Sequence, residues 1–398
     1  MKYPIGIQSF ESLRTNGYVY VDKTAYIYKL ATEGKYYFLS RPRRFGKSLI
    51  VSTMAAYFRG KRDLFKGLAI ENLEKEWTSY PVLYIDLNTG KYDSDDSLFH
   101  VLNDFLCKQE AVYGVSPSEV TLELRFKGLI ERVAQQTGRP VVILVDEYDK
   151  PMLQAINNKD LQSKFLATLK AFYSVLKTQD EYIHFAFLSG VTKFGKVSVF
   201  SDLNNLVDIS MDARYQAICG ITEKEMHDYF ENGIRYVAEI NGLTIEETLA
   251  KMKRRYDGYH FHQKSDGVYN PFSLLNTFAK GEFGSYWFET GTPTFLVQLL
   301  QRDKFYLPDL TEQQVSADFL NSIDSIDESP VPIIYQSGYL TIKGYDSEFQ
   351  VYTLGFPNEE VEEGFTNFLM PYYMNTGSES GPMFIRNFVI ALRQGKPE

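Results

Sequence analysis

The 398-residue sequence has only two cysteines, Cys107 and Cys219, and two tryptophans. The cysteines lie far apart and match no metal-ligand or redox spacing, so we expect two reduced, mostly buried thiols. No apolar run approaches the ~18–20 residues that a membrane-spanning helix needs. The first residues also lack the apolar core of a signal peptide. These absences predict a cytoplasmic protein with no membrane partner.

An excess of positive charge is also missing. The formal net charge is −9, which argues against general affinity for nucleic acid or anionic membranes but allows a local basic patch. Aromatic residues, in contrast, are abundant, with 29 Tyr and 29 Phe. They favour packed cores over disorder, and the length leaves room for two or three domains.

In the first half of the chain, short apolar runs alternate with longer segments. The apolar runs predict strands at 36–39, 81–87, 141–146, 184–190 and 205–211. The segments between them predict helices at 47–60, 97–114, 121–138 and 160–178. Three of the runs are almost continuously hydrophobic, as expected for strands covered on both faces of a parallel sheet. Residues 1–215 are therefore predicted to form an α/β domain.

Beyond residue 215 the pattern becomes mostly helical. Thr222 and Glu225 form a capping box at the start of a predicted helical lid, residues 216–284. Residues 285–375 mix helix patterns with a strand pair and predict a winged-helix-like region. The helix patterns there lie at 292–301, 311–323 and 358–373, and the strand pair at 338–355. Residues 376–398 are predicted to start a linker or a truncated C-terminal domain.

The stretch RPRRFGKSLI, residues 41–50, follows a predicted strand and leads into a predicted helix. Gly46, Lys47 and Ser48 match the last three positions of the phosphate-loop pattern G-x-x-x-x-G-K-[ST], and Arg41 replaces its first glycine. A GK[ST] triplet occurs by chance in roughly one chain in five of this length. Its strand–loop–helix setting, however, points N–H groups at phosphate oxygens. We predict that these residues bind a nucleotide: Arg43, Arg44, Phe45, Gly46, Lys47, Ser48 and Leu49.

In such a loop Lys47 would reach the β- and γ-phosphates and the Ser48 hydroxyl would bind Mg²⁺. A second motif, VVILVDEYDK, is an apolar run that ends in Asp146 and Glu147. Asp146 would support Mg²⁺ and Glu147 would polarise the attacking water. The alternative is a buried strand that ends in an acidic turn.

The order of the strands refines the class. The run at 81–87 lies between the phosphate loop and Asp146, and Glu147 follows that aspartate directly. These features indicate a P-loop NTPase of the additional-strand, catalytic-glutamate type. The run at 184–190 would then lie beside the phosphate loop. Thr192 or Lys193 at its tip would sense the γ-phosphate, although a loop with surface hydroxyls remains the alternative.

With these motifs the sequence resembles the AAA-ATPase-like family of bacterial and archaeal proteins. The matching segments are 10–24, 38–49, 145–151, 188–194, 256–261, 269–276 and 290–296. The resemblance implies binding of ATP and Mg²⁺, ATP hydrolysis, and a lid and winged-helix-like region after the core. Members often continue into a PD-(D/E)xK nuclease-like domain. No such site occurs before residue 398, so we expect the chain either to be cut upstream of that domain or to lack it.

Other residues have two readings each. Arg214 is the leading candidate for a catalytic arginine acting on the γ-phosphate, followed by Arg254 and Arg255, but surface ion pairs would also explain all three. Residues 18–24 would pack near the nucleotide base, or Thr24 would simply cap the next helix. Pro42 would stiffen the loop at a turn that glycine normally permits.

The sequence thus predicts an Mg²⁺-dependent ATPase or ATP-driven switch. By family analogy it could regulate an attached nuclease-like domain acting on DNA. A nucleotide-binding scaffold that does not hydrolyse ATP, or a protein-interaction module, is the alternative. A protein partner or a homo-oligomer is compatible with either reading.

Overall fold

The computed structural model describes residues 1–193, 205–290, 313–321 and 329–373. The helix predicted at 292–301 and the segment 376–398 lie outside the described residues. The fold that follows is that of the described part of the chain.

A five-stranded sheet forms the centre of the first half, with strand order β2-β3-β4-β1-β5 and every neighbouring pair parallel. Its strands are β1 (Tyr36–Ser40), β2 (Val82–Asp86), β3 (Val141–Asp146), β4 (Ile183–Gly190) and β5 (Val207–Asp208). The strand inserted between β1 and β3 is β4, while β2 lies at the edge beside β3. This confirms the predicted α/β class with a parallel sheet.

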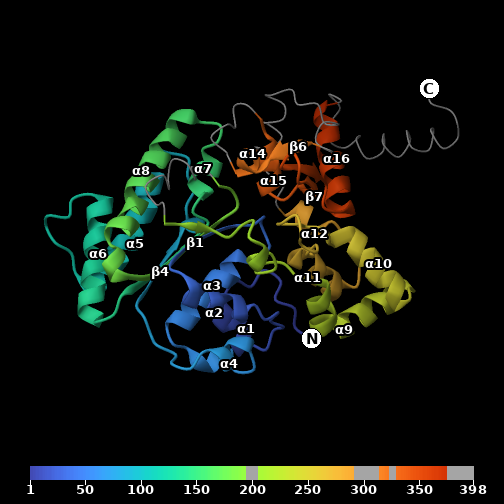
Figure 1. Cartoon of the computed structure of the whole chain (residues 1–398), viewed down its shortest axis with the longest axis horizontal. Coiled ribbons are helices and arrows are strands. Elements are labelled where there is room, and N and C mark those ends of the chain that lie inside the picture. The colour runs from blue at the N-terminus through green and yellow to red at the C-terminus, as the bar shows by residue number, and fades with distance from the viewer. Residues whose placement is uncertain (194–204, 291–312, 322–328, 374–398) are drawn as a thin grey trace.

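Side chains alternate between the two faces of this sheet, and each face is covered by helices (Figure 1). Along β1, Tyr36 and Phe38 belong to one hydrophobic core, and Tyr37 and Leu39 belong to the other. The first core contains α5 (Ser97–Tyr113), α6 (Leu122–Thr137), α7 (Lys150–Gln154) and α8 (Lys159–Thr178). The second contains α1 (Phe10–Thr15), α2 (Thr24–Glu33), α3 (Lys47–Phe58) and α4 (Ala69–Leu73). Both faces are thus buried, which explains the continuously apolar strands.

The four helices predicted between the strands are confirmed almost to the residue, as α3, α5, α6 and α8. Local caps explain the agreement: Thr121 accepts a hydrogen bond at the start of α6, and Gly138, with φ 65°, ends it. Short 3₁₀ helices occupy Arg62–Phe65, Leu87–Thr89, Asp180–Tyr182 and Ala213–Tyr215.

Three helices with their own apolar core follow the sheet: α9 (Glu223–Asn241), α10 (Ile245–Tyr256) and α11 (Pro271–Lys280). The short α12 (Tyr286–Glu289) comes next, and its Trp287 and Phe288 belong to the core of α1–α4. The predicted capping box of Thr222 and Glu225 is present, and Thr244 and Glu247 form a second one. Near the N-terminus, Tyr3 stacks on Phe278 of α11 with 5.8 Å between ring centroids. The first residues of the chain therefore run between the sheet and these helices.

The last described region combines a three-stranded antiparallel sheet with short helices. Its elements are β6 (Gln314–Ser316), α14 (Ala317–Asn321), α15 (Val331–Gln336), β7 (Thr341–Asp346), β8 (Val351–Gly355) and α16 (Glu359–Tyr373). The predicted strand pair and the last helix are confirmed. The helix predicted at 311–323 is wrong over 314–316, because Val315 turns inward in an alternating strand that pairs with β8.

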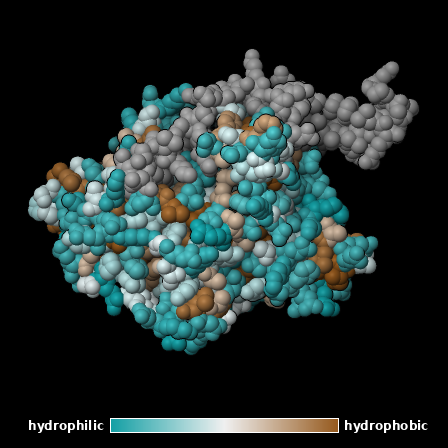
Figure 2. All heavy atoms as spheres, in the orientation of Figure 1, coloured by the Kyte–Doolittle hydropathy of each residue, from teal (hydrophilic) through white to brown (hydrophobic). Residues whose placement is uncertain are grey.

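The face shown in Figure 2 is mostly hydrophilic, with apolar residues in small separate groups. Over the described ranges, no helix is both long and apolar enough to cross a membrane.

Candidate functional site

The loop between β1 and α3 places the N-terminus of a helix at the carboxyl end of the parallel strands. Gly46 precedes α3 with φ 95°, a left-handed conformation that suits glycine, and Lys47 is the first helical residue. The first N–H groups of this 12-residue helix have no partner within the helix. The arrangement matches the phosphate-binding geometry predicted from the sequence.

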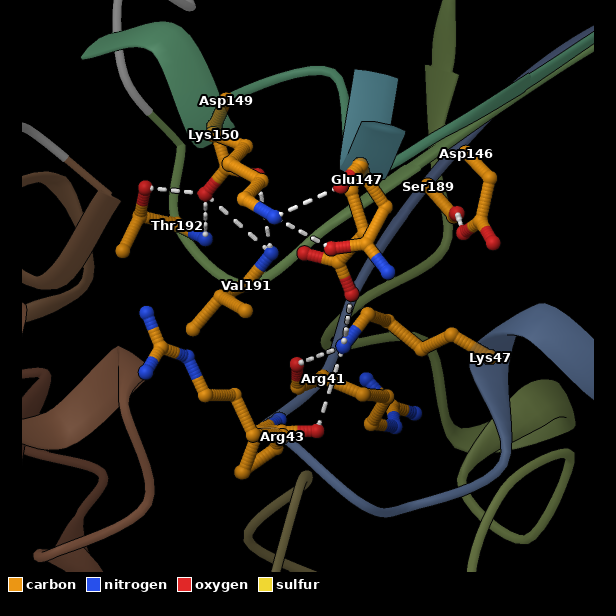
Figure 3. Close-up of polar contacts among 12 residues, drawn as sticks. Arg41, Arg43, Lys47, Asp146, Glu147, Asp149, Lys150, Ser189, Val191 and Thr192 are labelled. Carbon is orange, nitrogen blue, oxygen red and sulfur yellow. Dashed lines mark hydrogen bonds and ion pairs between the residues drawn. The ribbon is translucent and has the colours of Figure 1, made fainter. Parts of the chain in front are cut away.

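The Lys47 side chain is only 3% exposed, and its ammonium lies inside this loop (Figure 3). Nζ donates to the carbonyl oxygens of Arg41 (3.1 Å) and Pro42 (3.3 Å). It also lies 3.3 Å from Oε1 of Glu147, at the end of β3. The structure therefore brings together the two residues predicted to bind phosphate and activate water.

Asp146 lies at the carboxyl end of β3 and is 2% exposed. Its Oδ1 accepts a hydrogen bond of 2.6 Å from the Ser189 hydroxyl on the neighbouring strand β4. Burial raises the pKa of Asp146, opposed by hydrogen bonds from Ser189 and from Ser48 of the phosphate loop. The two predicted magnesium ligands, Ser48 and Asp146, thus lie near enough for Ser48 to lower the pKa of Asp146. A hydroxyl with a carboxylate is an oxygen donor set that Mg²⁺ favours.

Glu147 has φ 55°, unusual for a residue with a side chain. Its turn is fixed on both sides: the Tyr148 N–H donates to the Ser189 carbonyl (3.0 Å), and the Lys150 N–H donates to the Glu147 carbonyl (3.0 Å). Strained conformations of this kind persist where the surroundings enforce them, often at active sites. The hydrogen bonds that enforce this turn place the Glu147 carboxylate at the cavity and beside Lys47.

Asp149 links this turn by hydrogen bonds to the residues that follow β4. No role was predicted for it from the sequence. It is fully buried and accepts hydrogen bonds from the N–H groups of Val191 (3.2 Å) and Thr192 (2.6 Å) and from the Thr192 hydroxyl (Figure 3). Burial raises the pKa of Asp149 to about 6. The predicted sensor Thr192 therefore orients Asp149 and the turn that contains Glu147.

A cavity of about 490 Å³ opens over these groups. This volume is within the range of small-molecule sites. Four cationic side chains and one carboxylate line it: Arg43, Arg44, Lys47, Lys150 and Glu147. Such an excess of positive charge suits an anionic ligand, although the chain as a whole is acidic.

A smaller apolar pocket of about 90 Å³ adjoins this cavity, and both are lined by Pro4, Gly46, Leu49, Pro271 and Leu275. Its other walls come from the predicted base-packing segment, from the phosphate loop and from the chain before α9. They include Val19, Tyr20, Val21, Lys23, Phe45, Ile218, Cys219 and Ile221. The pair of pockets therefore offers a charged chamber beside an apolar one.

Comparison with known proteins agrees with this geometry. A family described as predicted AAA-ATPase matches residues 4–200. A protein of Azotobacter chroococcum mcd 1, described as an uncharacterized protein in the vnfD 5′ region, is 40% identical over 378 residues. That alignment covers 94% of this chain and 70% of the relative. The chain belongs to the predicted AAA-ATPase family.

A solved structure, the ORC2 protein of Aeropyrum pernix in ADPNP-ADP complexes, is also similar to this chain. The match has 11% sequence identity and covers 87% of this chain and 91% of that one, with a TM-score of only 0.30.

In this AAA-ATPase family member the predicted γ-phosphate sensor Lys193 and the predicted catalytic arginine Arg214 form ion pairs away from the cavity. Lys193 is 3% exposed, and its Nζ lies 2.9 Å from Asp208. Arg214 is largely exposed and pairs with Asp212 at 2.6 Å. Neither residue lines the cavity, so their predicted roles remain predictions that require a change of partner. Arg254 and Arg255 pair with Glu359 (3.4 Å) and Glu363 (3.1 Å).

The unusual Arg41 has a structural explanation. Its guanidinium is buried, donates to the carbonyls of Ser210 (2.7 Å) and Tyr215 (3.3 Å), and lies 3.9 Å from the Phe261 ring centroid. Burial lowers the pKa of Arg41 to about 10. The positive φ values in this loop fall instead on Arg44 (66°) and Gly46 (95°). Arg41 thus replaces a flexible glycine with a side chain that anchors the loop.

Residues of α12 and α15 also contact the site, which the sequence analysis missed. Trp287 donates its indole N–H to the carbonyl of Arg43 (2.9 Å). The side-chain Oε1 of Gln336 accepts a hydrogen bond from the backbone N–H of Lys193 (2.7 Å). These contacts join residues more than a hundred positions apart, and no local pattern predicts them. The phosphate loop and the tip of β4 are therefore both supported from the C-terminal half of the chain.

Proposed function

We propose that the protein is an Mg²⁺-dependent ATPase that works as an ATP-driven switch. The observation that supports this most directly is that Lys47, Ser48 and Glu147 line one cationic cavity, with the buried Asp146 directly before Glu147 in the chain. These residues lie at or just after the carboxyl ends of two strands, β1 and β3, that are separated in the sheet by β4, so their convergence does not depend on the GKS motif alone.

Each group has a role in this proposal. Lys47 and the N–H groups at the start of α3 bind the phosphate chain, and Ser48 and Asp146 bind Mg²⁺. When bound, the metal neutralises charge on the phosphates. Glu147 accepts a proton from the attacking water as its oxygen bonds to the γ-phosphorus. The bond from that phosphorus to the bridging oxygen breaks, and ADP leaves with the electron pair.

The apolar pocket is proposed to take the nucleobase. It adjoins the phosphate cavity, and its walls come from residues 19–23, from the phosphate loop and from α11. Because α11 belongs to the helical group, a bound nucleotide would contact both the sheet and these helices. Nucleotide binding would then stabilise one arrangement of the two, which is the basis of the proposed switch.

The second candidate is a nucleotide-binding scaffold without hydrolysis. One observation favours it: the Lys47 ammonium is bound by two loop carbonyls and by Glu147, and the Lys193 ammonium is bound by Asp208. If these contacts persisted with nucleotide present, neither lysine would be available to stabilise a transition state.

Phosphate release distinguishes the two candidates. Under saturating Mg-ATP, the wild type is expected to release phosphate at least about 100-fold faster than Glu147→Gln, because the variant lacks the base. Nucleotide binding, measured separately, should persist in the variant. Equal rates with intact binding would reject hydrolysis and leave the scaffold. Control of an attached nuclease-like domain, binding of DNA and self-association stay family-based proposals that this experiment does not test.

A further inference from the structure

Lys150 is a cationic residue of the cavity that does not belong to the phosphate loop. It is the first residue of α7, one turn after Glu147, and its side chain lines the cavity. Its Nζ donates to Asn88, at 2.9 Å to the carbonyl oxygen and 2.5 Å to Oδ1. Asn88 lies in the short 3₁₀ helix Leu87–Thr89 after β2 and lines the same cavity.

This pair sits on the side of the cavity formed by the carboxyl ends of β2 and β3. The other three cations, Arg43, Arg44 and Lys47, all come from the phosphate loop. Lys150 therefore supplies positive charge from a different wall, next to Glu147. An ammonium has three donors, and Asn88 accepts from it at two oxygens, so one donor remains to be directed at a ligand.

The terminal phosphate of a bound nucleotide is expected on this side. In a phosphate loop the lysine reaches the β- and γ-phosphates, and here Lys47 Nζ lies 3.3 Å from Glu147. A γ-phosphate close to Lys47 would thus lie beside the turn that leads into Lys150. A diphosphate would leave that place empty.

Lys193, predicted from the sequence as the γ-phosphate sensor, is less well placed. Its ammonium is buried against Asp208 at 2.9 Å, and its side chain lines a different, smaller cavity. Reaching the nucleotide would require breaking a buried ion pair, which is costly. Lys150 needs no such step.

We propose that Lys150, positioned by Asn88, binds the terminal phosphate and makes the site distinguish nucleoside triphosphates from diphosphates. This assignment rests on the proposed nucleotide-binding function and adds a specificity-determining residue to it. The contact is charge-assisted and is made by triphosphates alone.

The test compares affinities for two ligands, the Mg²⁺ complexes of ADP and of a non-hydrolysable ATP analogue, by calorimetry on the full 398-residue chain. Lys150→Met should weaken binding of the analogue about tenfold and change the ADP affinity less than about twofold. Lys150→Arg should restore most of the preference for triphosphate. Asn88→Ala, which removes the side-chain tether, should weaken the analogue by an intermediate factor.

Lys193→Met is the matched comparison and should leave the ratio of the two affinities unchanged. The assignment is overturned if Lys150→Met weakens both ligands equally, if it changes neither, or if Lys193→Met selectively weakens the triphosphate. ADP binding by every variant would confine such a failure to Lys150. Absence of binding by the wild type would instead reject the nucleotide-binding function itself.

Discussion

The ammonium of Lys47 and the carboxylate of Glu147 lie 3.3 Å apart, with exposures of 3% and 19%. They come from α3 and from the turn after β3, and together they form an ion pair at the cavity. The same ion pair that assembles the site thus also competes with a phosphate for Lys47. Charge in this part of the site must be redistributed when an anion enters.

Glu147→Gln removes this competition. We expect the variant to bind Mg-ATP about two- to fivefold more tightly than the wild type, the range of a partly exposed ion pair. Equilibrium titration measures this, and the exposed Glu181→Gln serves as the control that should change nothing. Weaker binding by the Glu147 variant would mean that the carboxylate helps to hold the nucleotide.

Trp287 offers an optical signal of the phosphate loop. Its indole N–H donates to the Arg43 carbonyl at 2.9 Å, whereas the other tryptophan, Trp77, packs on Tyr57 and Phe65. A nucleotide that shifts the loop should change the emission of Trp287. Tryptophan fluorescence of the Trp77→Phe protein should therefore still respond to Mg-ATP.

The matched variant Trp287→Phe keeps an aromatic ring but loses the donor and the reporter. Its fluorescence should not respond to Mg-ATP. A response that survives in Trp287→Phe and disappears in Trp77→Phe would place the nucleotide-dependent change elsewhere.

Arg41 and Arg44 should differ sharply when replaced by glycine. Arg41→Gly leaves the carbonyls of Ser210 and Tyr215 without this donor and creates a cavity at a buried position. The free energy of unfolding should therefore fall by about 2–3 kcal/mol. Arg44 already has φ 66°, so glycine there should change stability by less than about 0.5 kcal/mol. Denaturant unfolding without nucleotide measures both. Equal effects would contradict the anchoring role of Arg41.

Glu360 should make stability depend on pH. It is fully buried, accepts hydrogen bonds from Ser273 Oγ (2.7 Å) and from the backbone N–H of Trp287 (2.9 Å), and Arg255 is the nearby cation. Burial raises the pKa of Glu360 to about 7 from 4.5. The folded state therefore holds a proton that the unfolded state has released, and this contribution to stability falls as the pH rises from about 4.5 to 7.

Glu360→Gln should remove this contribution to the pH dependence of the free energy of unfolding. The stability of the variant relative to the wild type should therefore increase as the pH rises, by on the order of 2–3 kcal/mol at pH 8, if the new amide hydrogens find partners. Thermal unfolding of both proteins between pH 5 and 8 checks the direction. A difference between the two that is constant over that range would contradict the raised pKa of Glu360.

The sequence predicted those parts of the protein whose signals are local. Apolar runs covered on both faces identified the strands around Val141–Asp146, and caps such as Thr121 and Gly138 set the helix ends. The phosphate loop and the Asp146–Glu147 pair were predicted for the same reason: each is a short motif at the end of a strand. Short elements such as β6 have too few residues to show a period, and a neighbouring helical pattern concealed it.

The rest of the site depends on contacts between distant segments. Asp149 bonds to Thr192, Trp287 to Arg43, and the Gln336 side chain to the Lys193 N–H. None of these pairs leaves a pattern in either segment alone, because one partner of each pair is a backbone group that every residue type shares. Lys150 was visible in VDEYDKP, but only the folded chain places it beside Asn88 at the cavity.

The most direct test of the account is calorimetric titration of Mg-ATP into the wild type and into Lys47→Met, with unfolding curves to confirm that both are folded. The account predicts binding of one nucleotide by the wild type, weakened at least about 100-fold in the variant and clearly reduced when EDTA removes the metal. Equal affinity of a folded Lys47→Met protein, or no binding by the wild type, would contradict it.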